Sequence, residues 1–198
     1  VLNNRILWLI AVANIFVYFI RYGVVDWAPT YLAEVKGYSH KGSRLAYFLY
    51  EWAGIPGMLV SGYLSDKVFK GRRAPATILF MFGVLIAVFV YWKNPAGNPL
   101  IDNIALVSIG FLIYGPVMMI GLHAADLVPK KATGSATGLT GLLGYLIGSS
   151  FAGVVMGAVV DHLGWDGGFY TLIIACILAI VLLFMSMMGG KPSHQAHG

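Results

Sequence analysis

Long apolar runs are the feature that most restricts what this chain can fold into. Runs long enough to cross a bilayer lie at about residues 6–28, 45–65, 75–93, 103–128, 136–160 and 168–189. About 20 apolar residues cross the hydrocarbon core as a helix, because a helix satisfies its own backbone hydrogen bonds in lipid. The runs are longer than transmembrane strands and do not alternate. The sequence therefore predicts an all-α membrane protein, with six transmembrane helices bundled over residues 1–189 and a polar tail at 190–198.

The composition excludes several other classes of protein. Of the 198 residues, 59% are hydrophobic and 11% are charged, whereas ordinary soluble domains are about 25% charged. The connections between the apolar runs leave no room for a soluble catalytic domain, so we expect neither an enzyme nor a bound cofactor. The net charge is +5, and in a membrane protein the basic residues behind such an excess are expected first in cytoplasmic loops. We therefore expect no nucleic-acid partner.

Metal binding and secretion are disfavoured as well. Cys176 lies alone in an apolar run, which rules out a disulfide framework or a cysteine-based metal site. His123 and Asp126 have an i, i+3 spacing that suits a metal, but no second pair stands near them. The first apolar run is too long for a removable signal peptide. Because no methionine begins the chain, we expect Val1 to be an internal start.

The basic residues predict an orientation in the membrane. With six spans, both ends of the chain and the second and fourth loops share one side. That side carries eight basic residues, Arg5, Lys67, Lys70, Arg72, Arg73, Lys130, Lys131 and Lys191. The other side carries four, Lys36, Lys41, Arg44 and Lys93. Since Lys and Arg are enriched in cytoplasmic loops, we expect both ends of this segment in the cytoplasm.

A weak internal repeat divides the six expected helices into two units. A glycine and an aspartate four residues apart close the second span at Gly62 and Asp66, and again close the fifth span at Gly157 and Asp161. Both pairs end the middle helix of a three-helix unit. Successive units of three helices cross the membrane in opposite directions, so we expect two inverted repeats, a layout common in transporters.

Arg21 is the most informative residue for function, because it falls inside the first span. An arginine near the bilayer centre costs about 2.5–3.5 kcal/mol on insertion scales and is functional by default. Asn14, Tyr18 and Arg21 follow the spacing i, i+4, i+7, which places them on one helix face. A guanidinium there matches a phosphate or carboxylate group with two parallel hydrogen bonds. The alternative is that Arg21 pairs with Glu51 or Asp26 across the bundle and only holds helices together; we favour binding.

Glu51 is the second buried charge that needs an explanation. It lies one turn after Tyr47 in the second span and could bind a cation, carry a proton, or neutralise Arg21 when no anion is bound. The last role needs no further ion, so we favour it. Tyr114 and Tyr145 lie near the middle of their spans, away from the membrane interfaces where tyrosine is common. We expect both phenols to donate hydrogen bonds to an anion.

Several segments resemble a known family. Residues 62–73, with Gly62, Asp66, Lys67, Gly71, Arg72 and Arg73, resemble the loop signature of the major facilitator superfamily, in the form found between the eighth and ninth of its twelve helices. Residues 18–27, 111–123 and 129–136 resemble the organophosphate:phosphate antiporters within it, and residues 47–57 favour the members that carry glycerol-3-phosphate. The resemblance covers nearly the whole chain and matches the C-terminal six-helix half of that fold.

The resemblance implies a function for the whole transporter. It implies that glycerol-3-phosphate enters a bacterium through the inner membrane in exchange for inorganic phosphate, by alternating access of two six-helix halves. Exchange of a hexose phosphate or phosphoglycerate, or proton-coupled transport of an organic anion, are the alternatives. It also implies that the partner of this chain is an N-terminal six-helix half.

The resemblance also assigns roles to particular residues. Arg21 would grip the phosphate group together with an arginine of the N-terminal half. Tyr18, Tyr114 and Tyr145 would line the cavity, and Glu51 and Asp26 would form the charge network of this half. The charges around residues 66–73 are expected to join helix ends on the cytoplasmic face.

Overall fold

The computed structural model describes residues 3–189, which contain helices and no strands. The helices are α1 (Arg5–Glu34), α2 (His40–Tyr63), α3 (Arg73–Lys93), α4 (Pro99–Asp126), α5 (Thr133–Leu142) and α6 (Ser150–Gly189). Short π-helical segments follow α2 (η1, Leu64–Val68) and α5 (η3, Leu143–Ser149), and one 3-10 turn, η2 (Lys130–Ala132), precedes α5. The expected tail at 190–198 lies outside the described residues.

Local sequence explains where the first helices begin. The Asn4 side chain accepts the backbone N–H groups of Ile6 and Leu7 at 3.0 and 3.2 Å, which caps the start of α1. The Ser39 side chain accepts the N–H of Gly42 and caps α2 in the same way. Pro99 occupies the first position of α4, where its missing N–H costs nothing.

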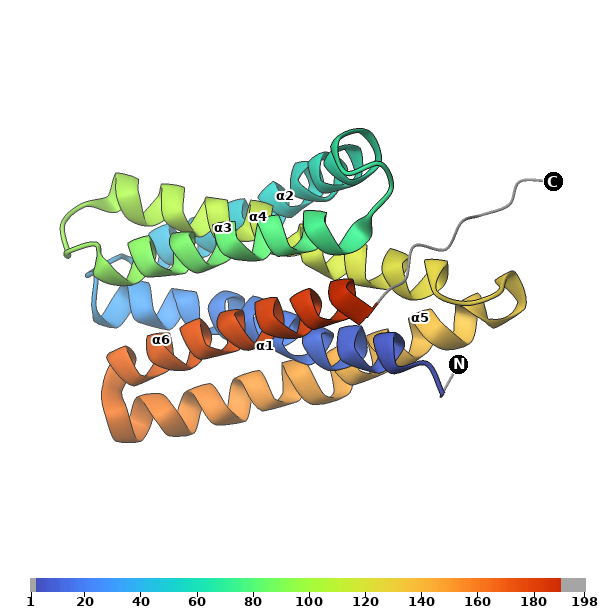
Figure 1. The fold of residues 1–198 in the computed structure, drawn as a ribbon. Helices are drawn as coiled ribbons and strands as arrows, with labels where there is room; N and C mark the ends of the chain where they lie inside the picture. The colour runs from blue at the N-terminus through green and yellow to red at the C-terminus, as the bar shows by residue number, and fades with distance from the viewer. Residues whose placement is uncertain (1–2, 190–198) are drawn as a thin grey trace.

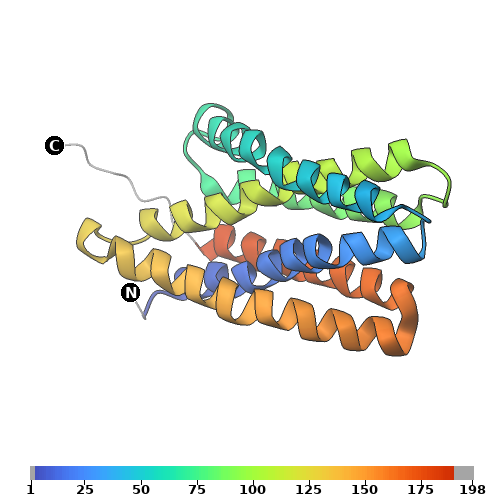
Figure 2. The same ribbon diagram turned by 180° about the vertical axis from the view of Figure 1, so that it is seen from behind.

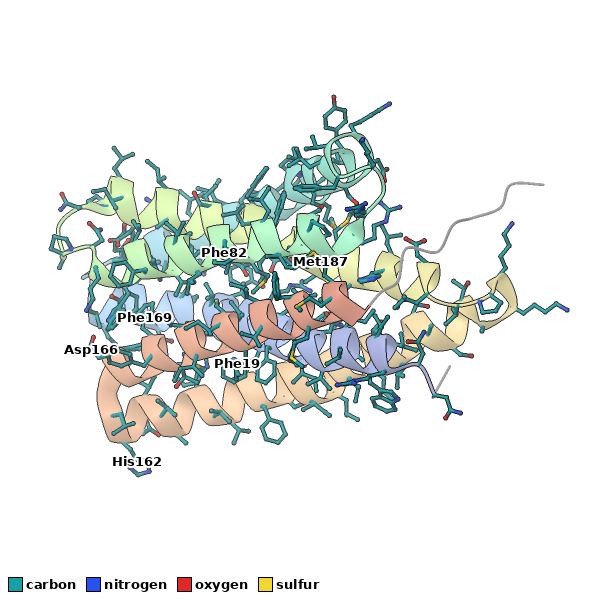
Figure 3. All side chains as sticks on the ribbon, in the orientation of Figure 1. Phe19, Phe82, His162, Asp166, Phe169 and Met187 are labelled. Atoms are coloured by element: carbon teal, nitrogen blue, oxygen red, sulfur yellow. The ribbon has the colours of Figure 1, made fainter. Side chains whose placement is uncertain are left out.

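The long segment after residue 130 folds back on itself. By length and composition, four helical segments of residues 3–189 could cross a membrane: Arg5–Glu34, Arg73–Lys93, Pro99–Asp126 and the 60-residue Lys130–Gly189. A straight helix of that last length would measure about 90 Å, three times the hydrocarbon core. Gly164, with φ 70° and ψ −176°, breaks the helix, and the chain reverses there (Figure 1). Figure 3 shows His162 on one arm of the turn and Asp166 and Phe169 on the other.

The helices pack in two groups that meet both at α1 and at α3. α4 lies between α2 and α3, and the second group, α5, η3 and α6, packs against α1, while α3 also packs against α6 (Figures 1 and 2). The start of α1, the α2–α3 turn and the α4–α5 connection lie at one end of the bundle, named here the Arg73 end. The α1–α2 and α3–α4 connections and the turn within α6 lie at the other, named here the Lys36 end.

Glycines allow α2 and α4 to approach closely. A Cβ added at Gly57 would overlap the carbonyl oxygen of Phe111, and one added at Gly110 would overlap the carbonyl oxygen of Tyr50. The two backbones therefore touch directly, as small residues permit in membrane helices. This contact sets the distance between the two helices that carry Glu51 and Tyr114.

Candidate functional site

Arg21 is connected to Glu51 through Tyr114. The Nη2 of Arg21, near the middle of α1, donates a hydrogen bond to the Tyr114 hydroxyl of α4 at 2.7 Å. That hydroxyl donates in turn to Oε2 of Glu51 on α2. The guanidinium also lies over the Tyr114 ring, 4.4 Å from its centre. Three helices thus meet at one chain of polar groups inside an apolar bundle.

The Arg21 guanidinium has an N–H donor without an acceptor in the described part of the chain. Its Nε is buried and has no hydrogen-bond partner within residues 3–189. A guanidinium has five N–H donors, and buried donors of this kind normally find acceptors. Tyr50, which is fully buried, donates its hydroxyl to the Arg21 carbonyl at 3.3 Å and so helps to hold this part of α1. The unused donors suit an anion that would complete their bonding.

Three tyrosines lie beside Arg21. The rings of Tyr18 and Tyr145 meet edge to face at 4.7 Å between centres, and Tyr22 lies 6.1 Å from Tyr18 and 6.3 Å from Tyr145. Tyr22 also lies 5.0 Å from the Arg21 guanidinium, a cation–π distance. Tyr145 is 52% exposed, so the group opens onto one face of the bundle. Tyr22 was not among the residues expected at the site. The signal that could have identified it is its position directly after Arg21 in the sequence.

Asp26 stands apart from the polar chain. It is exposed, and no ion pair found within residues 3–189 includes it. The direct pairing of Arg21 with Glu51 or Asp26, the alternative to anion binding, is also missing from the ion pairs of that part of the chain. Tyr114 stands between the two charges instead.

The loop signature forms a charged cluster at the Arg73 end. Arg73 donates from Nε to Oδ2 of Asp126 at 3.1 Å and from Nη1 to Oγ of Ser65 at 3.1 Å, and it also pairs with Asp66. The start of α3 is thereby joined to η1, which follows α2, and to the end of α4. Gly62 is half-buried in α2, and Gly71 (φ 80°) turns the chain before α3. Exposed members of the signature make none of these bonds: Lys67, Gly71 and Arg72.

Metal binding has no geometric support in the described chain. No three His, Cys, Asp or Glu side chains within residues 3–189 gather closely enough to hold an ion. Asp126, which has metal-like spacing from His123, forms the ion pair with Arg73 instead.

A second polar cluster, at the Lys36 end, was missed from the sequence. Lys36 and Asp102 form an ion pair at 3.2 Å, and each side chain is 1% exposed. The Lys36 ammonium also donates to the Asn94 carbonyl, and the Asn94 amide donates to Oδ1 of Asp102 at 2.8 Å. Lys36 follows the end of α1 and Asp102 lies in the first turn of α4, so each charge is favourable beside its helix dipole.

This cluster changes the count of basic loop residues and the pKa of a neighbouring tyrosine. Lys36, counted as a loop charge on the side with four basic residues, is buried, which leaves three basic residues on that side against eight on the other. Tyr38, in the α1–α2 connection, donates to the Pro99 carbonyl at 3.1 Å. Burial and the nearby Asp102 carboxylate raise the pKa of Tyr38 to about 12.

Comparisons with known proteins agree with this architecture. The family model described as "Major Facilitator Superfamily" matches residues 1–153. The chain is 67% identical to the glycerol-3-phosphate transporter of Bacillus subtilis over 98% of its own length and 44% of that protein's, and 51% identical to that of Haemophilus influenzae over 99% and 44%. The chain thus spans less than half the length of these relatives.

Solved structures show the same fold. The crystal structure of an auto-inhibited peptide transporter of the POT family superposes with a TM-score of 0.80 at 15% identity, over 93% of this chain and 37% of that one. The apolar helices, their packing and the family match over residues 1–153 lead to one conclusion: this multi-pass membrane protein belongs to the Major Facilitator Superfamily.

Proposed function

We propose that this chain is the C-terminal six-helix half of an antiporter that imports glycerol-3-phosphate in exchange for inorganic phosphate. The observation that carries the proposal is the half-buried Arg21, whose buried Nε has no partner among residues 3–189 and whose Nη2 donates to a neutral phenol. Both relatives compared above are named glycerol-3-phosphate transporters. The proposal makes the whole protein a carrier and not an enzyme.

In this proposal Arg21 grips the phosphate group with two parallel hydrogen bonds. An arginine from the N-terminal half would hold the same group from the other side, so that phosphate draws the two halves together. Alternating access requires that the ligand favour the closed arrangement over the open one. Organic and inorganic phosphate both supply that difference, which explains why each would exchange for the other without an ion gradient.

The remaining polar residues prepare Arg21 for that task. Glu51, reached through Tyr114, would balance the arginine charge while the site is empty. Tyr18 and Tyr145, whose rings touch at the open face, would contact the substrate. Asp26, which is exposed and forms no ion pair within residues 3–189, would complete the charge network only with residues of the other half.

We further propose how the segment lies in the membrane. α1, α2, α3, α4, the α5–η3–α6 segment up to Gly164, and the rest of α6 would be six spans in two inverted groups of three. The Arg73 end and residues 190–198 would face the cytoplasm of a bacterium, because the basic residues gather there. The bilayer would be the inner membrane.

Exchange in liposomes tests the proposal. The full-length protein, reconstituted in vesicles loaded with radiolabelled phosphate, should release label when glycerol-3-phosphate is added outside and should retain it in substrate-free buffer. Hexose phosphate and phosphoglycerate added instead test the other organophosphates. Release driven by a pH gradient alone, with no external phosphate compound, would refute exchange and favour a proton-coupled carrier.

A further inference from the structure

The fifth span is irregular at the point where it meets α1. The π-helical segment η3, Leu143–Ser149, lies between α5 and α6 and carries Tyr145. π-helical turns are rare in proteins, and they occur frequently at functional sites. The contacts of this segment with α1 therefore bear on where Tyr145 lies.

Asn14 supplies a bond to the last turn before the irregular segment. Its Nδ2 donates to the carbonyl oxygen of Thr140 at 2.8 Å, and the residue is only 3% exposed. The N–H of Leu143, at the end of α5, points to the carbonyls of both Leu139 and Thr140, so the helical ladder is already shared there. A buried amide is costly in an apolar bundle unless it makes such bonds.

Close packing transmits this bond to the tyrosines. A Cβ at Gly144 would lie 2.7 Å from the Asn14 Nδ2 and 2.8 Å from Cδ2 of Tyr18. A Cβ at Gly148 would lie 2.8 Å from Cβ of Tyr18. The π-helical segment thus rests directly on the face of α1 that carries Asn14 and Tyr18. Tyr145, between the two glycines, places its ring edge to face against Tyr18.

We propose that Asn14 is a positioning residue, which stabilises the π-helical segment through the Thr140 carbonyl and thereby holds Tyr145 beside Tyr18. The inference rests on the proposed function in one respect, namely that Tyr145 contacts the substrate. Asn14 touches no substrate in this arrangement and acts through the backbone of the fifth span.

The first experiment measures the segment itself, independently of transport. Asn14→Leu keeps roughly the volume of the side chain but has no polar atom to donate to a carbonyl; an aspartate would not serve, because a carboxyl group buried there would be protonated and could still donate. In the full-length protein, peptides covering residues 140–149 should exchange amide hydrogens faster, while peptides covering 165–189 keep their wild-type rates. Ser186→Ala, which removes another buried bond to a backbone carbonyl, is the matched control and should leave 140–149 unchanged. Wild-type exchange at 140–149 in Asn14→Leu would overturn the proposal.

The second experiment tests whether Asn14 acts through Tyr145. Loss of one hydrogen bond should weaken phosphate binding by about threefold to tenfold in Asn14→Leu. If the effect passes through Tyr145, the double variant with Tyr145→Ala should bind no more weakly than Tyr145→Ala alone. If the double variant instead weakens phosphate binding by the product of the two single effects, the proposal that Asn14 acts through Tyr145 is overturned.

Two further results, unchanged phosphate affinity in Tyr145→Ala and failure of the Asn14 variant to insert, can also be interpreted. If Tyr145→Ala leaves phosphate affinity unchanged, the substrate role of Tyr145 fails, whereas hydrogen exchange at 140–149 still decides whether Asn14 stabilises the segment. If Asn14→Leu does not insert, Asn14→Ala replaces it, since alanine also removes both the donor and the carbonyl oxygen that has no partner within residues 3–189.

Discussion

The buried ion pair at the Lys36 end should dominate local stability. Lys36→Met leaves the Asp102 carboxylate 1% exposed with its cation gone. Oδ1 would keep the Asn94 amide, but Oδ2 has no partner within residues 3–189. Removing one member of a buried pair costs about 3–5 kcal/mol, because the remaining charge is not compensated. We expect the free energy of unfolding to fall by that amount.

The same structure predicts a rescue and an internal reference. Replacing both charges, as Lys36→Met with Asp102→Leu, leaves no buried charge and should restore most of the stability. Arg73→Gln is the reference, since the Asp66 and Asp126 side chains are 60% and 55% exposed. Each of its pairs should contribute at most about 1 kcal/mol.

Unfolding of the full-length protein in mixed detergent and SDS micelles, followed by circular dichroism, measures these differences. Lys36 lies 15 residues beyond Arg21, about 22 Å along α1, so phosphate exchange per folded molecule should be unchanged. A loss under about 1 kcal/mol for Lys36→Met, or a double variant that loses the sum of the two single losses, would refute the argument.

Four more outcomes follow from the site and the packing. Arg21→Lys should insert normally yet lose nearly all phosphate exchange, because an ammonium lacks the planar fork; wild-type exchange would contradict this. Glu51→Gln should bind phosphate more tightly and release it more slowly at about pH 6 and about pH 8, whereas a proton carrier would instead lose its pH dependence. Gly57→Ala should reduce the folded yield, measured by size-exclusion chromatography, since its Cβ overlaps a backbone carbonyl of α4. An impermeant thiol reagent on intact cells should label a cysteine at Gly97 and spare one at Gly71; the reverse pattern would invert the orientation.

Arg21 and its neighbours show which parts of the site can be predicted from the helical periodicity of the sequence. The free-energy cost of an arginine in an apolar run identified Arg21 as the central residue of the site. Helical spacing then placed Tyr18 on the same face of α1. Which helices touch each other is a property of tertiary packing. The phenol of Tyr114 between Arg21 and Glu51 could therefore not be predicted. The alternative to anion binding was a direct ion pair, and in the structure the Tyr114 hydroxyl lies between the two charges instead.

Lys36 and η3 show two other limits of the sequence. A lysine between two apolar runs is typical of a solvated loop, and its burial depends on Asp102, which lies far along the chain. The π-helical segment contains ordinary apolar residues and glycine, so no local pattern distinguishes it from an α-helix. Its stabilising amide comes from α1, a distant part of the sequence.

The reversal at Gly164 has a mechanical consequence. The turn between the two arms is short, and both residues after it are anchored: Trp165 donates to Glu34 at 3.2 Å, and Asp166 accepts from Trp92 at 2.6 Å. These two bonds hold the tip of the helical arm that precedes Gly164. We therefore expect a displacement of Tyr145 to come from bending at η3, where the arm rests on α1, and not from sliding of the whole arm along its own axis.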